Sequence, residues 1–141
     1  MSETLPIWNT IEQLLRAPNR DDLVEIRALT RQAIAANRRD DDIGCGDELY
    51  ALCFLLYLVG DPEDVALVYE AKYLNMDTGS VIDAHLLTMR RDRATMLAAL
   101  ASLPPGVQRP HLESDLVDAF DRPLFDDSAA FERGLRQYFN V

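Results

Sequence analysis

The chain has 141 residues, 48% of them hydrophobic and 27% charged, so it can bury a core without disulfides or metals. Its formal net charge of −10 repels nucleic-acid phosphates and attracts basic proteins, so no binding to nucleic acid is expected. Residues 1–10 lack the basic start and apolar run of a signal peptide, and no apolar run reaches the roughly 20 residues of a membrane span. We therefore expect one cytoplasmic domain over residues 1–141, with no membrane partner and an oligomeric state that the sequence does not determine.

The first two predicted helices lie before residue 40. Residues 7–17 carry apolar side chains at helical spacing, and Pro18 ends that segment. Asp21 or Asp22 then caps a longer helix that runs to about Asn37. One face of this second helix is apolar and consists of Leu23, Ile26, Leu29, Ala33 and Ile34. Both segments are predicted to pack on a core through one side.

The stretch Cys45–Val59 is the most apolar part of the chain. It carries no charge after Glu48, and its apolar side chains occupy all sides of a helix rather than one stripe. Such a helix is enclosed by neighbours, so we expect it to form the centre of the core. Cys45 and Cys53 are about 12 Å apart on this helix, too far for a disulfide, and Cys53 is expected to be a core thiol.

The sequence Gly60-Asp61-Pro62 predicts a tight corner after the central helix. Gly60 suits the left-handed position that ends a helix, Asp61 is a preferred N-cap, and Pro62 fits the first turn of the next helix. A helix to about Leu74 is then predicted. Together with the central helix it forms an α-hairpin rich in tyrosine.

The next part of the chain is predicted to contain a loop and two helices. Residues 75–79 have the composition of a loop, and Ser80 with Asp83 resembles a capping box for a helix over residues 81–89. Asp92 then caps a further helix to about residue 103.

Two last helices are predicted, over residues 111–120 and 128–139. No segment shows the period-two alternation of a strand, so the predicted fold class is all-α. About eight helices fall into four pairs that begin near residues 7, 45, 80 and 111, a spacing typical of helical repeats. An irregular HEAT- or TPR-like stack of four α-hairpins and a compact helical bundle both fit this pattern, and the stack is the favoured arrangement.

Carboxylates are concentrated between residues 40 and 71, where nine occur without a basic residue. An acidic surface of this kind fits a basic protein partner, although a merely solvated face is the alternative. The candidates for partner binding are Asp40, Asp41, Asp42, Asp47, Glu48, Asp61, Glu63 and Asp64. A calcium loop over residues 40–51 is rejected because Cys45 and Ala51 stand where it needs Gly and Glu. We expect no metal and no cofactor.

A second group of polar residues lies around the single lysine. Lys72, Asp77, Thr78, Asp83 and His85 could line a pocket for a small molecule, with His85 as a general base. The structural alternative is that Lys72 forms an ion pair with Asp77 or Asp83 and that His85 is a satisfied core histidine. The sequence favours this alternative, because Asp83 and His85 are two residues apart and their side chains diverge on a helix. No catalytic residue is therefore predicted.

Residues 60–87 resemble a pattern found in small, uncharacterised, all-helical bacterial proteins. The shared positions are Gly60-Asp61-Pro62-Glu63-Asp64, Ala71-Lys72, Asn75, Asp77-Thr78, Asp83 and Leu86-Leu87. In size, acidity and helicity the chain is also similar to the immunity proteins that neutralise polymorphic or contact-dependent toxins. That second resemblance implies a protein that works by binding another protein.

Three classes of function fit these observations. The favoured one is a non-enzymatic interaction module with an acidic face, whose most concrete form is a toxin-neutralising immunity protein. The alternative is a small-molecule-binding protein or enzyme with the pocket around Lys72. The third is a structural subunit that dimerises through a large apolar face. No Gly-rich phosphate loop, paired-cysteine zinc signature or serine elbow occurs in the chain.

Overall fold

The computed structural model describes residues 4–39, 47–103, 107–121 and 128–141. Within these residues the regular secondary structure is entirely helical, which confirms the predicted all-α class. The α-helices are α1 (Thr4–Arg16), α2 (Leu23–Arg39), α3 (Asp47–Val59), α4 (Val65–Lys72), α5 (Met76–Val81), α6 (Arg93–Ala99), α7 (Arg109–Asp121) and α8 (Ser128–Phe139). Short 3₁₀ segments connect several of them: η1 (Arg20–Asp22), η3 (Pro62–Asp64), η4 (Ala84–Thr88) and η5 (Leu100–Ser102).

Helix α3 is enclosed by the rest of the protein, as its composition predicted. Nine of its 13 side chains are buried. They include Phe54 and Tyr57, which are fully buried and among the largest such side chains in the core. Taking one large apolar side chain out of water contributes about 1.5–3 kcal/mol, so α3 supplies a large share of the core stabilisation.

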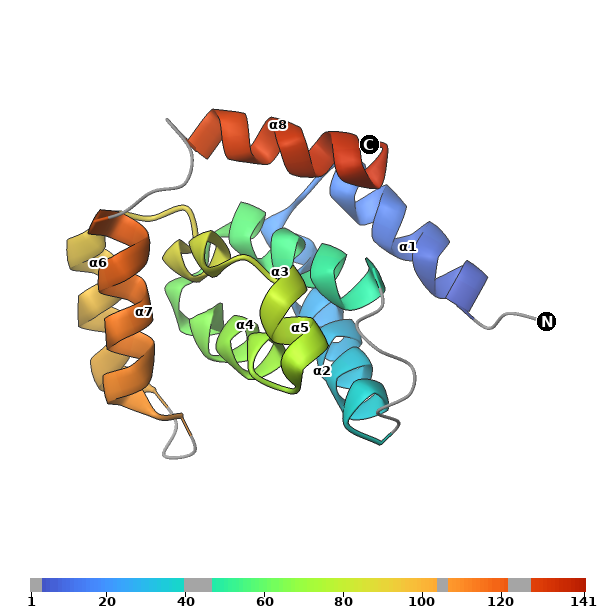
Figure 1. Cartoon of the computed structure of the whole chain (residues 1–141). Helices are drawn as coiled ribbons and strands as arrows, with labels where there is room; N and C mark the ends of the chain where they lie inside the picture. Colours follow the sequence, from blue (N-terminus) through green and yellow to red (C-terminus); the bar gives the residue numbers. More distant parts are fainter. Residues whose placement is uncertain (1–3, 40–46, 104–106, 122–127) are drawn as a thin grey trace.

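Helices α1, α2, α4 and α8 pack against α3, whereas α5, α6 and α7 pack mainly on other elements (Figure 1). Helices α1 and α2 contact it directly, and α4 contacts both α3 and α2. Helix α8 lies across the top of the view in Figure 1, where Phe131 packs on Tyr57 and Phe139 on Phe54 with ring centroids 5.7 and 6.2 Å apart. Helices α6 and α7 lie side by side, and α7 also contacts η4. Of the two arrangements that fitted the sequence, these contacts are those of a bundle around a central helix rather than of successive stacked hairpins.

The corner between α3 and α4 has the predicted geometry. Gly60 has φ +76°, and its N–H donates to the carbonyl oxygen of Leu56 at 2.9 Å. A Cβ at this position would lie 3.1 Å from the carbonyl oxygen of Met89, so both the backbone angle and the space favour glycine. Asp61 caps η3 by accepting a hydrogen bond from the N–H of Glu63 at 3.1 Å. Pro62 occupies the first position of that segment.

The prediction for residues 75–89 was wrong. Residues 76–81 form α5 instead of a loop, because Asn75 and Thr78 make a reciprocal capping box at its start. Ser80 lies inside α5 rather than at the start of a helix. Asp83 caps η4 by accepting from the N–H of His85 at 2.8 Å. The expected helix over residues 81–89 is therefore divided between the end of α5 and a 3₁₀ segment.

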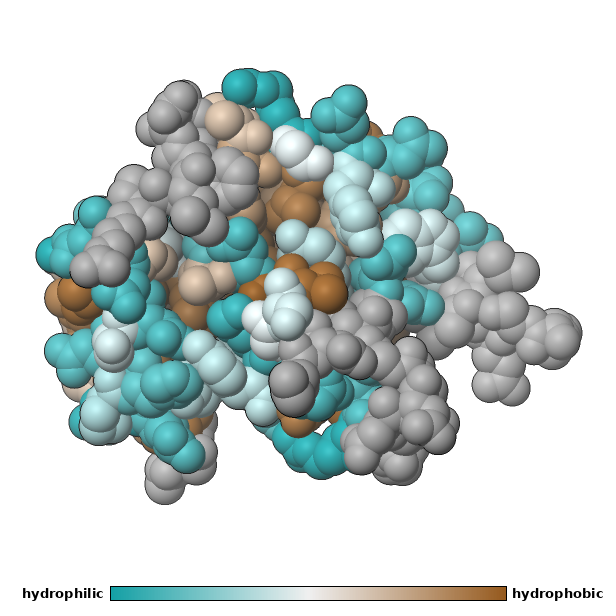
Figure 2. Space-filling view, in the orientation of Figure 1, coloured by the Kyte–Doolittle hydropathy of each residue, from teal (hydrophilic) through white to brown (hydrophobic). Residues whose placement is uncertain are grey.

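The surface of the described residues carries few large apolar groups. Those most exposed lie on different elements: Val24 on α2, Tyr73 after α4, Val81 on α5 and Tyr138 on α8. Figure 2 shows hydrophilic side chains over α7 and the outside of α1, with hydrophobic residues mainly toward the middle of this face. None of the described helices combines the length and the apolar character that spanning a bilayer requires.

Candidate functional site

Two of the predicted partner-binding carboxylates are internal. Asp61 is 9% and Asp64 4% exposed, and both are paired with Arg27 of α2. The Arg27 Nε donates to Asp64 Oδ1 at 2.7 Å, and its Nη2 lies 3.2 Å from Asp61 Oδ2, which Arg20 also contacts at 3.2 Å. These two carboxylates tie η3 to α2 and are not part of an exposed acidic surface, which corrects the prediction for them.

Burial affects both partners of the Arg27–Asp64 pair. It raises the pKa of the Asp64 carboxyl, against the opposing effect of the hydrogen bond from Arg27. The same hydrogen bond raises the pKa of the Arg27 guanidinium. The second oxygen of Asp64, Oδ2, is buried and accepts no hydrogen bond from a described residue. Asp64 therefore depends heavily on Arg27 for its charge to be tolerated.

Those of the other predicted carboxylates that the structure describes, Asp47, Glu48 and Glu63, do not form one patch. Asp47 and Glu48 open α3, whereas Glu63 follows its far end, and the length of a 13-residue helix separates these positions by about 20 Å. Asp47 accepts a hydrogen bond from the Tyr138 hydroxyl at 2.9 Å. Asp40, Asp41 and Asp42 lie outside the described residues. The acidic face predicted from the sequence is thus divided between the two ends of α3.

The described residues of the predicted pocket around Lys72 form hydrogen bonds and packing contacts within the protein. The Lys72 Nζ donates to the carbonyl oxygens of Gly79 and Ile82 at 2.8 and 2.6 Å, so it caps the C-terminal end of α5. The prediction that Lys72 forms an ion pair with Asp83 is wrong, because the Lys72 Nζ donates to these two carbonyl oxygens instead. Burial lowers the pKa of Lys72, and the charge of Asp83 opposes this shift at longer range. The side chain of Asp77 lies outside the described residues.

Thr78 and His85 also make contacts within the core of the protein. Thr78 is fully buried, and its hydroxyl bonds the backbone oxygens of Lys72 and Asn75. The His85 ring lies between Tyr57 and Phe131, with centroids 5.8 and 4.5 Å away, and burial lowers its pKa. None of the described members of this group lines the large cavity that other described residues form.

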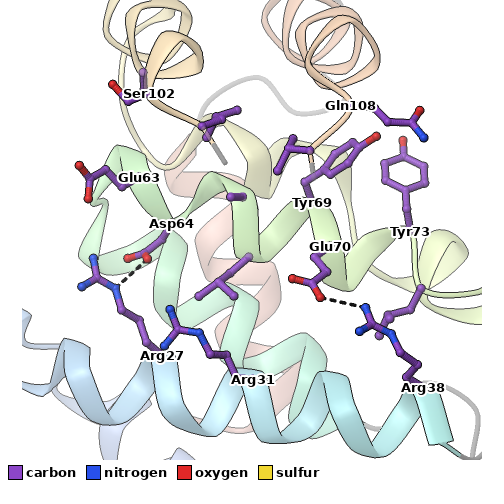
Figure 3. A pocket seen from close by; sticks show the side chains of 16 residues that line it. Arg27, Arg31, Arg38, Glu63, Asp64, Tyr69, Glu70, Tyr73, Ser102 and Gln108 are labelled. Atoms are coloured by element: carbon purple, nitrogen blue, oxygen red, sulfur yellow. Dashed lines mark hydrogen bonds and ion pairs between the residues drawn. The ribbon is translucent and has the colours of Figure 1, made fainter. Parts of the chain in front are cut away.

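That cavity is an open groove of about 960 Å³ on the other side of α4. Helix α2 forms one wall, η3 and α4 form the back, and the segment from the end of α6 to the start of α7 forms the opposite wall (Figure 3). The aliphatic part of its lining includes Ala66, Leu67, Leu74, Ala99, Leu103 and Val107. We refer to this feature as the α2–α4 groove.

The α2 wall of the groove is basic. Arg27, Arg31 and Arg38 all line it, and Figure 3 shows their side chains rising from α2 along its lower edge. Arg27 is paired with Asp64, and Arg38 with Glu70 at 2.8 Å. Arg31 lies between them and has no ion-pair partner among the described residues. One exposed guanidinium of the groove is therefore available to a ligand.

Two tyrosines form one end of the groove. The Tyr69 hydroxyl lies 2.7 Å from His111 Nδ1, and the Tyr73 hydroxyl donates to Asp115, so both link α4 to α7. Burial raises the pKa of both hydroxyls. Both hydroxyls stay protonated near neutral pH, Tyr73 as the donor to Asp115, whereas the tautomer of His111 determines the direction of the Tyr69 hydrogen bond.

The sequence did not indicate this groove, because its walls come from three separate parts of the chain. One signal was present, however. Arg20, Arg27, Arg31 and Arg38 recur at intervals of seven, four and seven residues, which places them on one face of a helix. In the structure Arg27 and Arg38 of this face pair with acidic residues of η3 and α4.

The fold and the groove define an all-α domain with an open, amphipathic groove. Among the described residues no three His, Cys, Asp or Glu side chains lie together as a metal site would require. Comparison of the chain with protein-family models, with curated proteins and with solved structures gives no match.

Proposed function

We propose that the protein is a non-enzymatic interaction module that binds another protein through the α2–α4 groove. The observation that carries the proposal is the composition of this groove: arginine and tyrosine over an aliphatic floor. Arginine and tyrosine are enriched among the residues that dominate binding at protein interfaces. The groove is also open along one side, whereas sites for small molecules enclose most of their ligand.

The charge of the molecule supports a protein partner of opposite sign. The internal ion pairs do not change the net charge of −10, so the long-range field still attracts basic proteins. Such a field accelerates association, while contacts in the groove determine how long the complex lasts. The acidic residues at the two ends of α3 contribute to this faster association.

The particular role that we propose is neutralisation of a toxin. Its support is the small size, the acidity and the helical fold, together with the resemblance to immunity proteins in these three properties. A partner that damages cells when produced alone, and not when produced together with this protein, is the expected result. A partner without toxicity would contradict this role and leave the interaction module in place.

Site-specific photo-crosslinking tests the binding module itself. A photoreactive amino acid at Ser102, which is exposed and lines the groove, is expected to capture one protein from a lysate of the producing cells. The same group at Gln137, exposed on α8, is the matched control and is not expected to capture that protein. Identical products from both positions, or a small molecule that copurifies and is lost in groove variants, would contradict the proposal.

A further inference from the structure

The charges along the α2–α4 groove leave one position for an anion. Three arginines and three carboxylates line the groove. Asp64 holds Arg27, and Glu70 holds Arg38, which leaves Arg31 on the α2 wall and Glu63 near one end. Arg31 follows Arg27 by one helical turn, so its guanidinium lies in the middle of the wall rather than at its edge (Figure 3).

The surroundings of Arg31 favour a single carboxylate over a phosphate. A planar guanidinium matches a carboxylate with two parallel hydrogen bonds. A phosphate carries about twice the charge and meets Glu63, Asp64 and Glu70 in the same groove. The net charge of −10 adds a repulsion that grows with the charge of the ligand.

The rest of the groove favours apolar groups beside that carboxylate. Leu67, Leu103 and Val107 line it, are only partly buried, and pack on the core from its floor and far wall. Apolar side chains placed on them would be taken out of water. A ligand that reaches both Arg31 and this floor must carry a carboxylate and apolar groups on the same face, which short peptide segments provide.

We infer that the α2–α4 groove binds a peptide segment of another protein in which an Asp or Glu side chain, held by Arg31, is flanked by apolar side chains on Leu67, Leu103 and Val107. This inference rests on the proposed function and adds the chemistry of the partner. The acidic residue belongs to the docking segment, and the partner as a whole can still be basic.

Selection from a random peptide library on the immobilised full chain tests the inference. The enriched peptides are expected to share one Asp or Glu next to large apolar residues. Arg31→Glu is expected to weaken their binding about tenfold to a hundredfold, since a hydrogen bond to a charged group is lost and a repulsion is added. Arg133→Glu makes the same charge change on the exposed side of α8 and is expected to alter binding less than about twofold.

A charge exchange separates a contact at Arg31 from a general effect of charge. Peptides whose acidic residue is replaced by Lys are expected to bind Arg31→Glu better than they bind the wild type. Enriched peptides without an acidic residue, equal binding to Arg31→Glu and wild type, displacement by inorganic phosphate at the concentration that displaces the peptide, or no enrichment at all would each overturn the inference. The crosslinking at Ser102 would then still report on the interaction module, so the two failures are distinguishable.

Discussion

At the scale of single residues, Arg27 holds a carboxylate that is almost removed from water. The Asp64 side chain is 5% exposed, and its only described ion-pair partner is Arg27. Arg27→Ala is expected to destabilise the protein by about 3 kcal/mol, because it leaves a buried carboxylate without its hydrogen-bonded ion-pair partner and with Arg31 acting only at longer range. Urea unfolding at neutral pH measures this change.

Arg20→Ala is the matched control for that substitution. Arg20 also contacts Asp61 at 3.2 Å, but its side chain is 66% exposed. Its loss is expected to cost less than about 1 kcal/mol, as is usual for solvated ion pairs. Equal losses for the two variants would show that Asp64 does not depend on Arg27.

His85 is expected to make the folded state sensitive to mild acid. Burial lowers the pKa of His85 below its ordinary value of 6.5, while the charges of Asp83 and Glu132 oppose this shift. As the pH falls below 6.5, the unfolded chain binds a proton that the folded protein resists, so the free energy of unfolding decreases. The decrease cannot exceed about 1.4 kcal/mol per pH unit for one group.

The measurement compares the wild type with His85→Gln in urea at pH 7.5 and 5.5. The variant is expected to lose less stability between the two values, because one proton-linked group is gone. Other groups titrate in both proteins and cancel in the difference. The same loss in both proteins would exclude His85 as the source.

At the scale of elements, the corner between α3 and α4 depends on Gly60. Its φ of +76° opposes a side chain, and so does the Met89 carbonyl oxygen, which would lie 3.1 Å from an added Cβ. Gly60→Ala is expected to destabilise the protein by about 1–2 kcal/mol. Gly134 lies inside α8 with nothing within 4 Å of such a Cβ, so Gly134→Ala is expected to stabilise it by about 0.5–1 kcal/mol. Thermal unfolding of both variants checks the opposite signs.

Helix boundaries were predicted correctly from the sequence where the capping residues allow only one position for the helix start. The Gly60-Asp61-Pro62 corner and the Asp92 cap, which accepts from the N–H of Thr95 at 2.7 Å, are examples. At residues 75–83 the prediction failed, because Ser80 with Asp83 was interpreted as the helix start and Asn75 with Thr78 was assigned to a loop. In the structure the helix starts at Asn75 and Thr78, because these two side chains satisfy two backbone N–H groups reciprocally.

The candidate site was harder to predict than the elements, because it depends on contacts between distant positions. Arg27 and Asp64 are 37 residues apart, and their pairing removes a carboxylate from the surface. Asp47 and Glu63 are close enough in the chain to suggest one acidic patch, yet α3 holds them at opposite ends. Charge counted along a sequence therefore gave the net charge of the molecule and not the positions of its carboxylates in space.

At the scale of the whole molecule, packing around one central helix predicts a single cooperative transition. The only tryptophan, Trp8, lies in α1 and packs on Phe139 of α8 with ring centroids 6.1 Å apart. Its fluorescence and the far-ultraviolet circular dichroism are expected to report the same urea midpoint. Two separate midpoints would show that a part of the chain, such as α6 with α7, unfolds independently.

The position of α8 also has a consequence for synthesis of the protein. Phe131 and Phe139 cover Tyr57 and Phe54 of α3, and Arg136 donates to the carbonyl oxygen of Leu15 in α1 at 3.2 Å. During synthesis, α1 and α3 emerge from the ribosome long before residue 139 is added. The aromatic side of α3 therefore stays uncovered while the chain grows. Nascent chains that stop before α8 should therefore bind chaperones, and chaperone dissociation should coincide with emergence of α8.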